Sequence, residues 1–186
     1  MGDQPMMRLL ALTITAILTC STAMAQSVSA NRYTTDLADL DAHASASLAY
    51  SDNATTPADI TVTTAGTWYK VPLDDSSFEV TSHCTFDDAN DRIIVLHPGK
   101  YVIAAQFSFS GTANTTFTGR MFKNDQQCFC GFKRKMGATG DVGSASLVSG
   151  VSMAAGDYLE LKVTADGSSK TFSVHLVQMT VFHVAN

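Results

Sequence analysis

The chain has 186 residues, of which 45% are hydrophobic and 16% charged, and its formal net charge is −5 at pH 7. This length and apolar content suit a single domain with a buried core and exclude an intrinsically disordered chain. A nucleic-acid-binding protein normally carries a basic surface, so the acidic balance argues against a nucleic-acid partner. The sequence holds 22 Thr, 18 Ser and 15 Asp but only 2 Glu. Because Thr favours strands, Asp and Ser favour turns and Glu favours helices, this composition predicts an all-β fold.

The first 25 residues have the pattern of a secretory signal peptide. Arg8 supplies a positive charge, residues 9–18 form an apolar run, and Ala23-Met24-Ala25 provides a small-x-small cleavage site. The run is much shorter than the roughly 20 residues that span a bilayer, so no membrane span is predicted. Two alternatives are lipidation at Cys20 and retention of the segment inside an assembly such as a virion. Residues 26–44 are polar and are interpreted as a linker or a short oligomerising helix.

Residues 45–186 consist of short β-type runs separated by turn signals, which is typical of a sandwich or barrel. Residues 158–163 and 101–109 alternate between apolar and more polar positions, so each predicts a strand with one buried face. The last run, 171–184, is partly apolar on both faces, which indicates a central position or burial by another subunit. Strand-ending turns are predicted at Pro98-Gly99, Asn124-Asp125, Gly156-Asp157 and Asp166-Gly167.

Four segments of this domain are similar to motifs of a known superfamily. Residues 86–109 contain a strand, a Gly turn and an aromatic-rich strand; 121–125 end in a Lys-Asn turn; 145–161 contain a Ser-Gly strand and a Gly-Asp turn; and 172–184 fit a closing strand. The chain thus resembles the complement globular-head and tumour-necrosis-factor-like superfamily, in the single-domain form found in bacteria and bacteriophages. The resemblance implies a jelly-roll β-sandwich of two antiparallel sheets and about ten strands, which assembles as a homotrimer.

In such a trimer the last strand would lie near the threefold axis. The residues expected at the subunit interface are His175, Val177, Met179, Val181 and His183. Rings formed by the two histidines would make assembly sensitive to pH, although histidines whose hydrogen bonds are satisfied within their own subunit are the more common case.

The chain beyond the leader keeps three cysteines, Cys84, Cys128 and Cys130. Cys128 and Cys130 are two positions apart, so in an extended strand they share a face but do not easily bond to each other. A bridge from Cys84 to one of them is the predicted pairing, and the remaining thiol is buried or pairs between subunits. Cys-x-Cys is weak support for a zinc site.

Two further groups could bind ions. Asp87, Asp88, Asn90 and Asp91 supply oxygen ligands of the kind calcium prefers, although a solvated acidic turn uses the same residues. Calcium is the one cofactor considered. Arg120, Lys123, Lys133, Arg134 and Lys135 form a basic group that could meet an anionic glycan or another acidic surface, or could protect an exposed sheet edge from pairing.

No Gly-x-Ser-x-Gly elbow occurs, and the five histidines have no metal-binding spacing, so an enzyme is not predicted. The predicted function is a non-enzymatic, homotrimeric, extracellular module for recognition, adhesion or surface structure. The alternative is a bacteriophage virion component, such as a head fibre, a decoration protein or a tail-tip receptor-binding protein. The expected partners are other copies of the chain and a glycan or cell-surface ligand.

Overall fold

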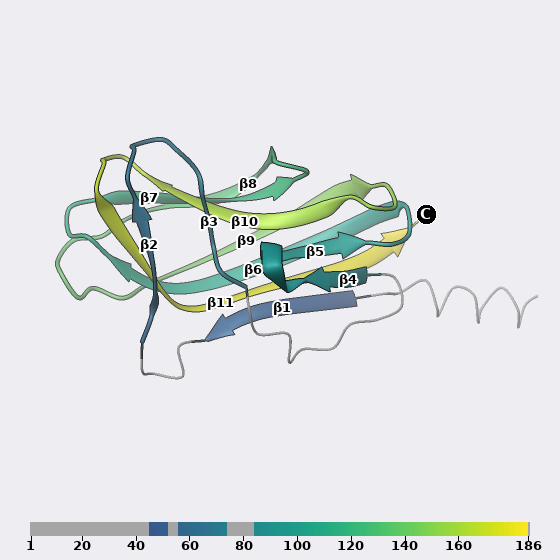
Figure 1. Ribbon diagram of the computed structural model, residues 1–186, viewed down its shortest axis with the longest axis horizontal. Coiled ribbons are helices and arrows are strands. Elements are labelled where there is room, and N and C mark those ends of the chain that lie inside the picture. The colour runs from purple at the N-terminus through teal and green to yellow at the C-terminus, as the bar shows by residue number, and fades with distance from the viewer. Residues whose placement is uncertain (1–44, 52–55, 74–83, 186) are drawn as a thin grey trace, which may run out of the picture. The chain divides into compact units, whose positions relative to one another are not determined.

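The computed structural model describes residues 45–51, 56–73 and 84–185, apart from the side chains of Ser45, Leu48 and Phe129. These residues belong to one compact unit, Ala42–Asn186. Their strands form two antiparallel sheets that pack face to face (Figure 1). The predicted signal peptide, the lipidation alternative at Cys20 and the predicted linker of residues 26–44 lie outside the described residues.

The first sheet, sheet A, carries the N-terminal and C-terminal strands of the described chain. Its strands are hydrogen-bonded in the order β1 (Ser45–Ser51), β11 (Lys170–Ala185), β6 (Gly99–Gly111) and β9 (Gly143–Met153), and β2 (Ala58–Val62) also pairs with β11. Each pair is antiparallel. Sequence-distant strands therefore lie side by side in this sheet.

The second sheet, sheet B, contains the remaining strands. Its order is β4 (Cys84–Asp87), β5 (Arg92–Val95), β10 (Tyr158–Ala165), β7 (Thr116–Lys123) and β8 (Gln126–Lys135), with β3 (Tyr69–Lys70) also pairing with β10. One 3-10 turn, η1 (Asp88–Asn90), joins β4 to β5. The predicted all-β sandwich of two antiparallel sheets is confirmed, with eleven strands in the described residues where about ten were predicted.

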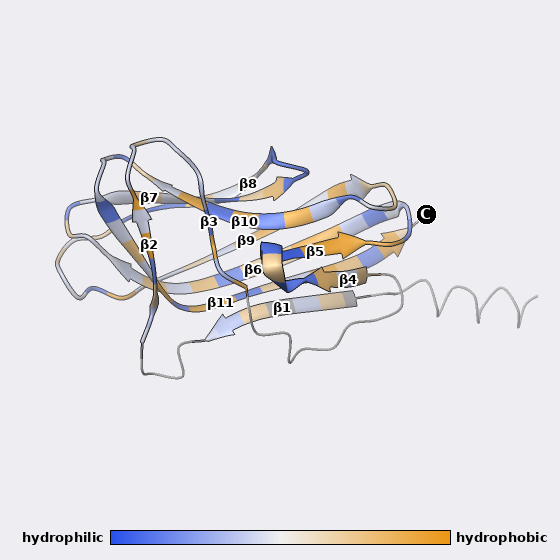
Figure 2. Ribbon diagram, in the orientation of Figure 1, coloured by the Kyte–Doolittle hydropathy of each residue, from blue (hydrophilic) through white to orange (hydrophobic). Residues whose placement is uncertain are grey.

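The core between the sheets is built from alternate residues of each strand. On β6, the row from Tyr101 to Phe109 predicted to share a face is buried throughout, and so are Leu159, Leu161 and Val163 on β10. Phe109 stacks on Phe172 with ring centroids 4.5 Å apart, and it also meets Phe132 of the other sheet at 5.5 Å. Burying each such ring contributes about 1.5–3 kcal/mol, so this cluster holds the two sheets together. Apolar strand segments appear as orange bands in Figure 2.

The four predicted turns all lie at strand boundaries. Asn124 and Asp125 both have positive φ, 48° and 63°, which is the conformation a two-residue hairpin turn requires. Position 99 needs a glycine because the His183 ring packs closely against its backbone; a Cβ at this position would lie 2.3 Å from His183 Nε2. Local turn chemistry therefore sets the strand ends as predicted.

A β-bulge in β11 changes which residues face the core. The register with β6 shifts between Val174 and Leu176, so one extra residue, His175, is accommodated there. Before the bulge Phe172 and Val174 point inward, and after it the inward residues are Val177, Met179, Val181 and His183. The large apolar residues that point outward after the bulge are consequently Leu176, Phe182 and Val184, which are partly exposed.

Candidate functional site

The outer face of sheet A is nearly free of charge and exposes large apolar side chains. Val148 is 67% exposed, Val184 52%, Phe182 46% and Leu176 41%. In the outward rows of β1, β2, β6, β9 and β11, the ionisable side chains of the described residues are Asp59, Lys100 and His175. The face carries a shallow hollow of about 340 Å³, whose lining includes Ala104, Gln106, Val148, Gln178, Thr180 and Phe182.

The polar groups on this face bond to one another. Gln106 Nε2 donates to Gln178 Oε1 at 2.8 Å, and Gln178 Nε2 donates to Ser47 Oγ at 3.1 Å. Ser47 Oγ lies 3.1 Å from Thr180 Oγ1. This ladder crosses β6, β11 and β1, so the face can be covered without leaving these groups unsatisfied.

The residues predicted for the subunit interface do not share this face. Val177, Met179 and Val181 are fully buried in the core between the two sheets, and His183 is 4% exposed with its ring edge-on to Tyr101. The prediction of an interface role is therefore wrong for these four, because the bulge reverses the alternation of β11. His175 does face outward, where its Nε2 lies 2.9 Å from Ser110 Oγ of β6.

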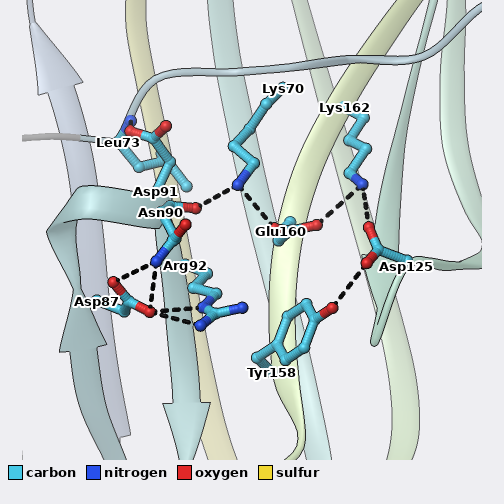
Figure 3. Close-up of polar contacts among 10 residues, drawn as sticks. All are labelled: Lys70, Leu73, Asp87, Asn90, Asp91, Arg92, Asp125, Tyr158, Glu160 and Lys162. Atoms are coloured by element: carbon cyan, nitrogen blue, oxygen red, sulfur yellow. Dashed lines mark hydrogen bonds and ion pairs between the residues drawn. The ribbon is translucent and has the colours of Figure 1, made fainter.

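The outer face of sheet B, in contrast, carries a chain of ion pairs (Figure 3). Glu160 of β10, with a side chain only 4% exposed, lies 2.9 Å from Lys70 Nζ and 3.0 Å from Lys162 Nζ. Lys162 also pairs with Asp125 at 2.5 Å, and Tyr158 Oη donates to Asp125 Oδ2 at 2.8 Å. The alternation of residues 158–163 predicts that Glu160 lies on the solvated face of its strand, and nothing in the sequence indicates that its side chain is buried.

These contacts shift the pKa values of the partners. Hydrogen bonds from Lys162 and then Tyr158 lower the pKa of Asp125, and the bond to Asp125 raises the pKa of Tyr158. Burial opposes the charge on Lys162, but its bonds to Asp125 and Glu160 outweigh burial and raise its pKa. The lowered pKa of Asp125 and the raised pKa of Lys162 favour the charged form of each, and the raised pKa of Tyr158 favours its protonated form, which suits a structural role rather than proton transfer.

The acidic group at β4 and η1 is engaged by protein donors. Asp87 accepts from Arg92 Nε at 2.8 Å and from Asn90 Nδ2 at 2.9 Å, while Asp91 accepts from the Leu73 amide at 3.0 Å. A hydrogen bond from Asn90, with further contributions from Arg92, lowers the pKa of Asp87. Within the described ranges, no three His, Cys, Asp or Glu side chains gather into a possible metal site. The geometry gives the calcium hypothesis, which included Asp88, no support.

The structure divides the five predicted basic residues into three places. Lys123 pairs with Asp157 at 2.7 Å and donates to the Ser152 carbonyl at 2.8 Å. Arg134 lies against Gly143 on the inward side of β8. The outward rows of β7 and β8 hold the other three, Arg120, Lys133 and Lys135. Lys135 is paired with Thr116 at the start of β7, and Lys123 is the last residue of that strand, so the two lysines are separated by about 23 Å along the sheet.

The predicted disulfide is wrong, because Cys84 and the other two cysteines lie on opposite edges of sheet B. Cys84 belongs to β4, and Cys128 and Cys130 belong to β8, four strand steps away. At about 4.8 Å per step the separation is about 19 Å, whereas bridged cysteines have Cα atoms within about 7 Å. All three thiols are free, and burial raises the pKa of Cys84 to about 11.

No helix in the part of the chain that the structure describes is long and apolar enough to cross a membrane.

Comparison with known proteins supports the fold alone. No family model matches the chain, and no curated protein matches its sequence. Among solved structures, Eiger TNF from S. frugiperda is similar with a TM-score of 0.52 at 11% identity, over 77% of this chain and 94% of that one. Murine APRIL, solved at pH 5.0, is similar with a TM-score of 0.50 at 13% identity, over 76% of this chain and 99% of that one. The chain therefore has a TNF-like jelly-roll fold.

Proposed function

We propose that the protein is a non-enzymatic homotrimer whose subunits meet through the outer face of sheet A, and that it acts outside the cytoplasm as a recognition, adhesion or surface-structural module. The observation that carries this proposal is the contrast between the two outer faces. Four of the exposed large apolar side chains lie on sheet A, where charge is nearly absent, while the ion pairs crowd sheet B. A neutral face that exposes Phe182 and Val148 is the one that gains from burial.

The dimensions of this face suit a subunit contact. Four strands at about 4.8 Å spacing and about 11 residues of length at 3.3 Å per residue cover on the order of 700 Å². A partner in a stable protein complex buries about 800 Å². The hydrogen-bonded ladder from Gln106 to Ser47 supports the same use, since its polar groups are already satisfied when the face is covered. The outward rows of sheet A hold three ionisable side chains among the described residues, Asp59, Lys100 and His175, so little charge has to be desolvated.

The TNF-like fold supports a trimer because the resemblance seen in the sequence implies threefold assembly. The predicted signal peptide supports an extracellular location. The non-enzymatic character is supported by the ion pairs of sheet B, where the acidic groups are occupied by Lys and Arg partners rather than directed into a cleft.

Light scattering coupled to gel filtration tests the assembly. We expect the purified protein to elute with three times the mass of its subunit. Phe182→Asp and Val148→Asp should each yield a monomer, because either change places a charge on the covered face. The matched control is Leu96→Asp, which alters a 45% exposed apolar residue in the turn between β5 and β6.

The result that contradicts the proposal is a wild-type monomer at micromolar concentration. Dissociation by Leu96→Asp to the same extent as by Phe182→Asp would also contradict it, since the control residue is not on sheet A.

A further inference from the structure

Three cations occupy one surface on the outward rows of β7 and β8. We call Arg120, Lys133 and Lys135 the basic strip. Lys133 is paired in register with Thr118, Lys135 with Thr116, and Arg120 with Gly131. Residues two apart on a strand are about 6.6 Å apart, so Lys133 and Lys135 are neighbours and Arg120 is diagonal to Lys133 on the next strand.

The basic strip differs from the other cations of sheet B in lacking ion pairs. Lys70, Arg92, Lys123 and Lys162 each lie within 3 Å of a carboxylate, whereas no such pair involves the basic strip within the described residues. Arg120 donates instead to a neutral group, Gln127 Oε1, at 3.2 Å. Three charges are therefore available to a ligand.

Asp166 contacts the end of the basic strip, because it bonds to Thr116, the register partner of Lys135. Its Oδ1 accepts a hydrogen bond from the Thr116 amide at 3.0 Å, and hydrogen bonds from Thr116 lower its pKa, with a smaller contribution from Lys133. Among the described residues, Asp166 and Lys133 form no ion pair.

Protection of a sheet edge does not account for the whole arrangement. β8 is the edge strand of sheet B, so Lys133 and Lys135 could discourage pairing with another chain. Arg120, however, lies on β7, which has a partner on each side, and it protects no edge. The strip extends inward from the edge across two strands, as a binding surface does.

We propose that the basic strip binds an acidic polysaccharide, whose carboxylate or sulfate groups are held by Arg120, Lys133 and Lys135. The hydroxyl-bearing residues Thr116 and Thr118 occupy the same outward rows and add hydrogen-bonding groups of the type that sugars use. The strip is on sheet B, so it remains accessible when sheet A is covered by other subunits.

Two other polyanions fit less well. Proteins that bind nucleic acids contact many phosphates with many cations, whereas the basic strip offers three cations in a chain whose net charge is −5. A membrane surface requires an apolar anchor beside the cations, and none of the exposed large apolar side chains in the described part of the chain lies on β7 or β8.

Binding to immobilised heparin and to immobilised polygalacturonate, with neutral dextran as a blank, tests the proposal. We expect Lys133→Ala/Lys135→Ala to weaken binding about tenfold at about 50 mM salt, since each exposed charge pair contributes up to about 1 kcal/mol. The double change should also reduce the dependence of log affinity on log salt by about two, one for each cation. The matched control is Arg134→Ala, which removes a charge from the same strand but from its inward side.

Three results would overturn the proposal. The first is that the wild type binds neither polysaccharide, and the second is that Arg134→Ala lowers the affinity, per charge removed, as much as the double variant does. The third is that duplex DNA displaces the polysaccharide at equal charge concentration. Polysaccharide binding by the basic strip does not depend on trimer assembly, and the Phe182→Asp variant tests the two proposals separately. A monomeric Phe182→Asp variant that still binds and still responds to Lys133→Ala/Lys135→Ala supports the strip, whatever the oligomeric state of the wild type.

Discussion

Replacement of Glu160 by Gln tests whether the ion pairs on sheet B stabilise the fold. The change removes the anion between Lys70 and Lys162, which lie 2.9 and 3.0 Å from its carboxylate. Removing one partner of a buried pair costs about 3–5 kcal/mol. The Lys70 side chain is 33% exposed, however, and Lys162 keeps Asp125, so neither ammonium group is left without water or a partner. We therefore expect a loss of about 2 kcal/mol in the free energy of unfolding.

Urea denaturation followed by the fluorescence of Trp68, the only tryptophan, measures this loss at a fixed protein concentration. The matched control is Asp88→Asn, which removes an acid from an exposed position in η1 and should change stability by less than about 0.5 kcal/mol. In Glu160→Gln/Lys162→Met both members of the Glu160–Lys162 pair are replaced, and each single variant already loses that pair, so the double variant should lose less stability than the sum of the single variants. If Glu160→Gln loses no more stability than Asp88→Asn, the reasoning about a buried anion is refuted.

Three other predictions concern single positions. Gly99→Ala should destabilise the fold by about 2–3 kcal/mol in urea, because the new Cβ would lie 2.3 Å from His183 Nε2 and 2.7 Å from the Ala185 carbonyl; a variant as stable as the wild type would contradict this. Burial opposes ionisation of Asp157, but hydrogen bonds from Lys123, Ala154 and Asn124 lower its pKa to about 2. The ionised carboxylate should therefore contribute about 1–2 kcal/mol to the free energy of unfolding above pH 3.8, and this contribution should be lost as the pH falls to 2. Urea unfolding curves at the two pH values measure this difference, and Asp157→Asn should abolish it. Cys128 and Cys130 should be alkylated in the native protein before Cys84, which is 3% exposed, and peptide mass spectrometry that found Cys84 modified first would contradict the burial order.

The features that sequence predicted correctly are local ones. A hairpin turn depends on the two residues at its tip, so Asn124-Asp125 could be placed without knowing the sheet. Alternation over a single strand likewise depends on neighbours in the chain, and it gave the buried row of β6.

The features that sequence could not predict depend on which strands become neighbours. Cys84 and Cys128 are 44 positions apart in the sequence, and only the strand order shows that they occupy opposite edges of sheet B. Lys123 and Arg134 belonged to a basic group by sequence distance, yet one is neutralised by Asp157 from another turn and the other lies on the inward side of its strand. The ion pairs around Glu160 could not be predicted, because they come from different parts of sheet B. Lys70 of β3 pairs with Glu160, and Asp125 of the β7–β8 turn pairs with Lys162, the second partner of Glu160.

The bulge at His175 is an intermediate case, because a local signal for it was present. Apolar residues occupy even positions at Phe172 and Val174 and odd positions at Val177, Met179 and Val181. An unbroken strand would bury one set and turn the other outward, and it would bring Gln178 and Thr180 into the core, where each polar group without a partner costs about 1–3 kcal/mol. One extra residue lets both apolar sets point inward. The same extra residue turns Leu176 and Phe182 outward, so the bulge both completes the core and creates the neutral face of sheet A on which assembly is proposed to depend.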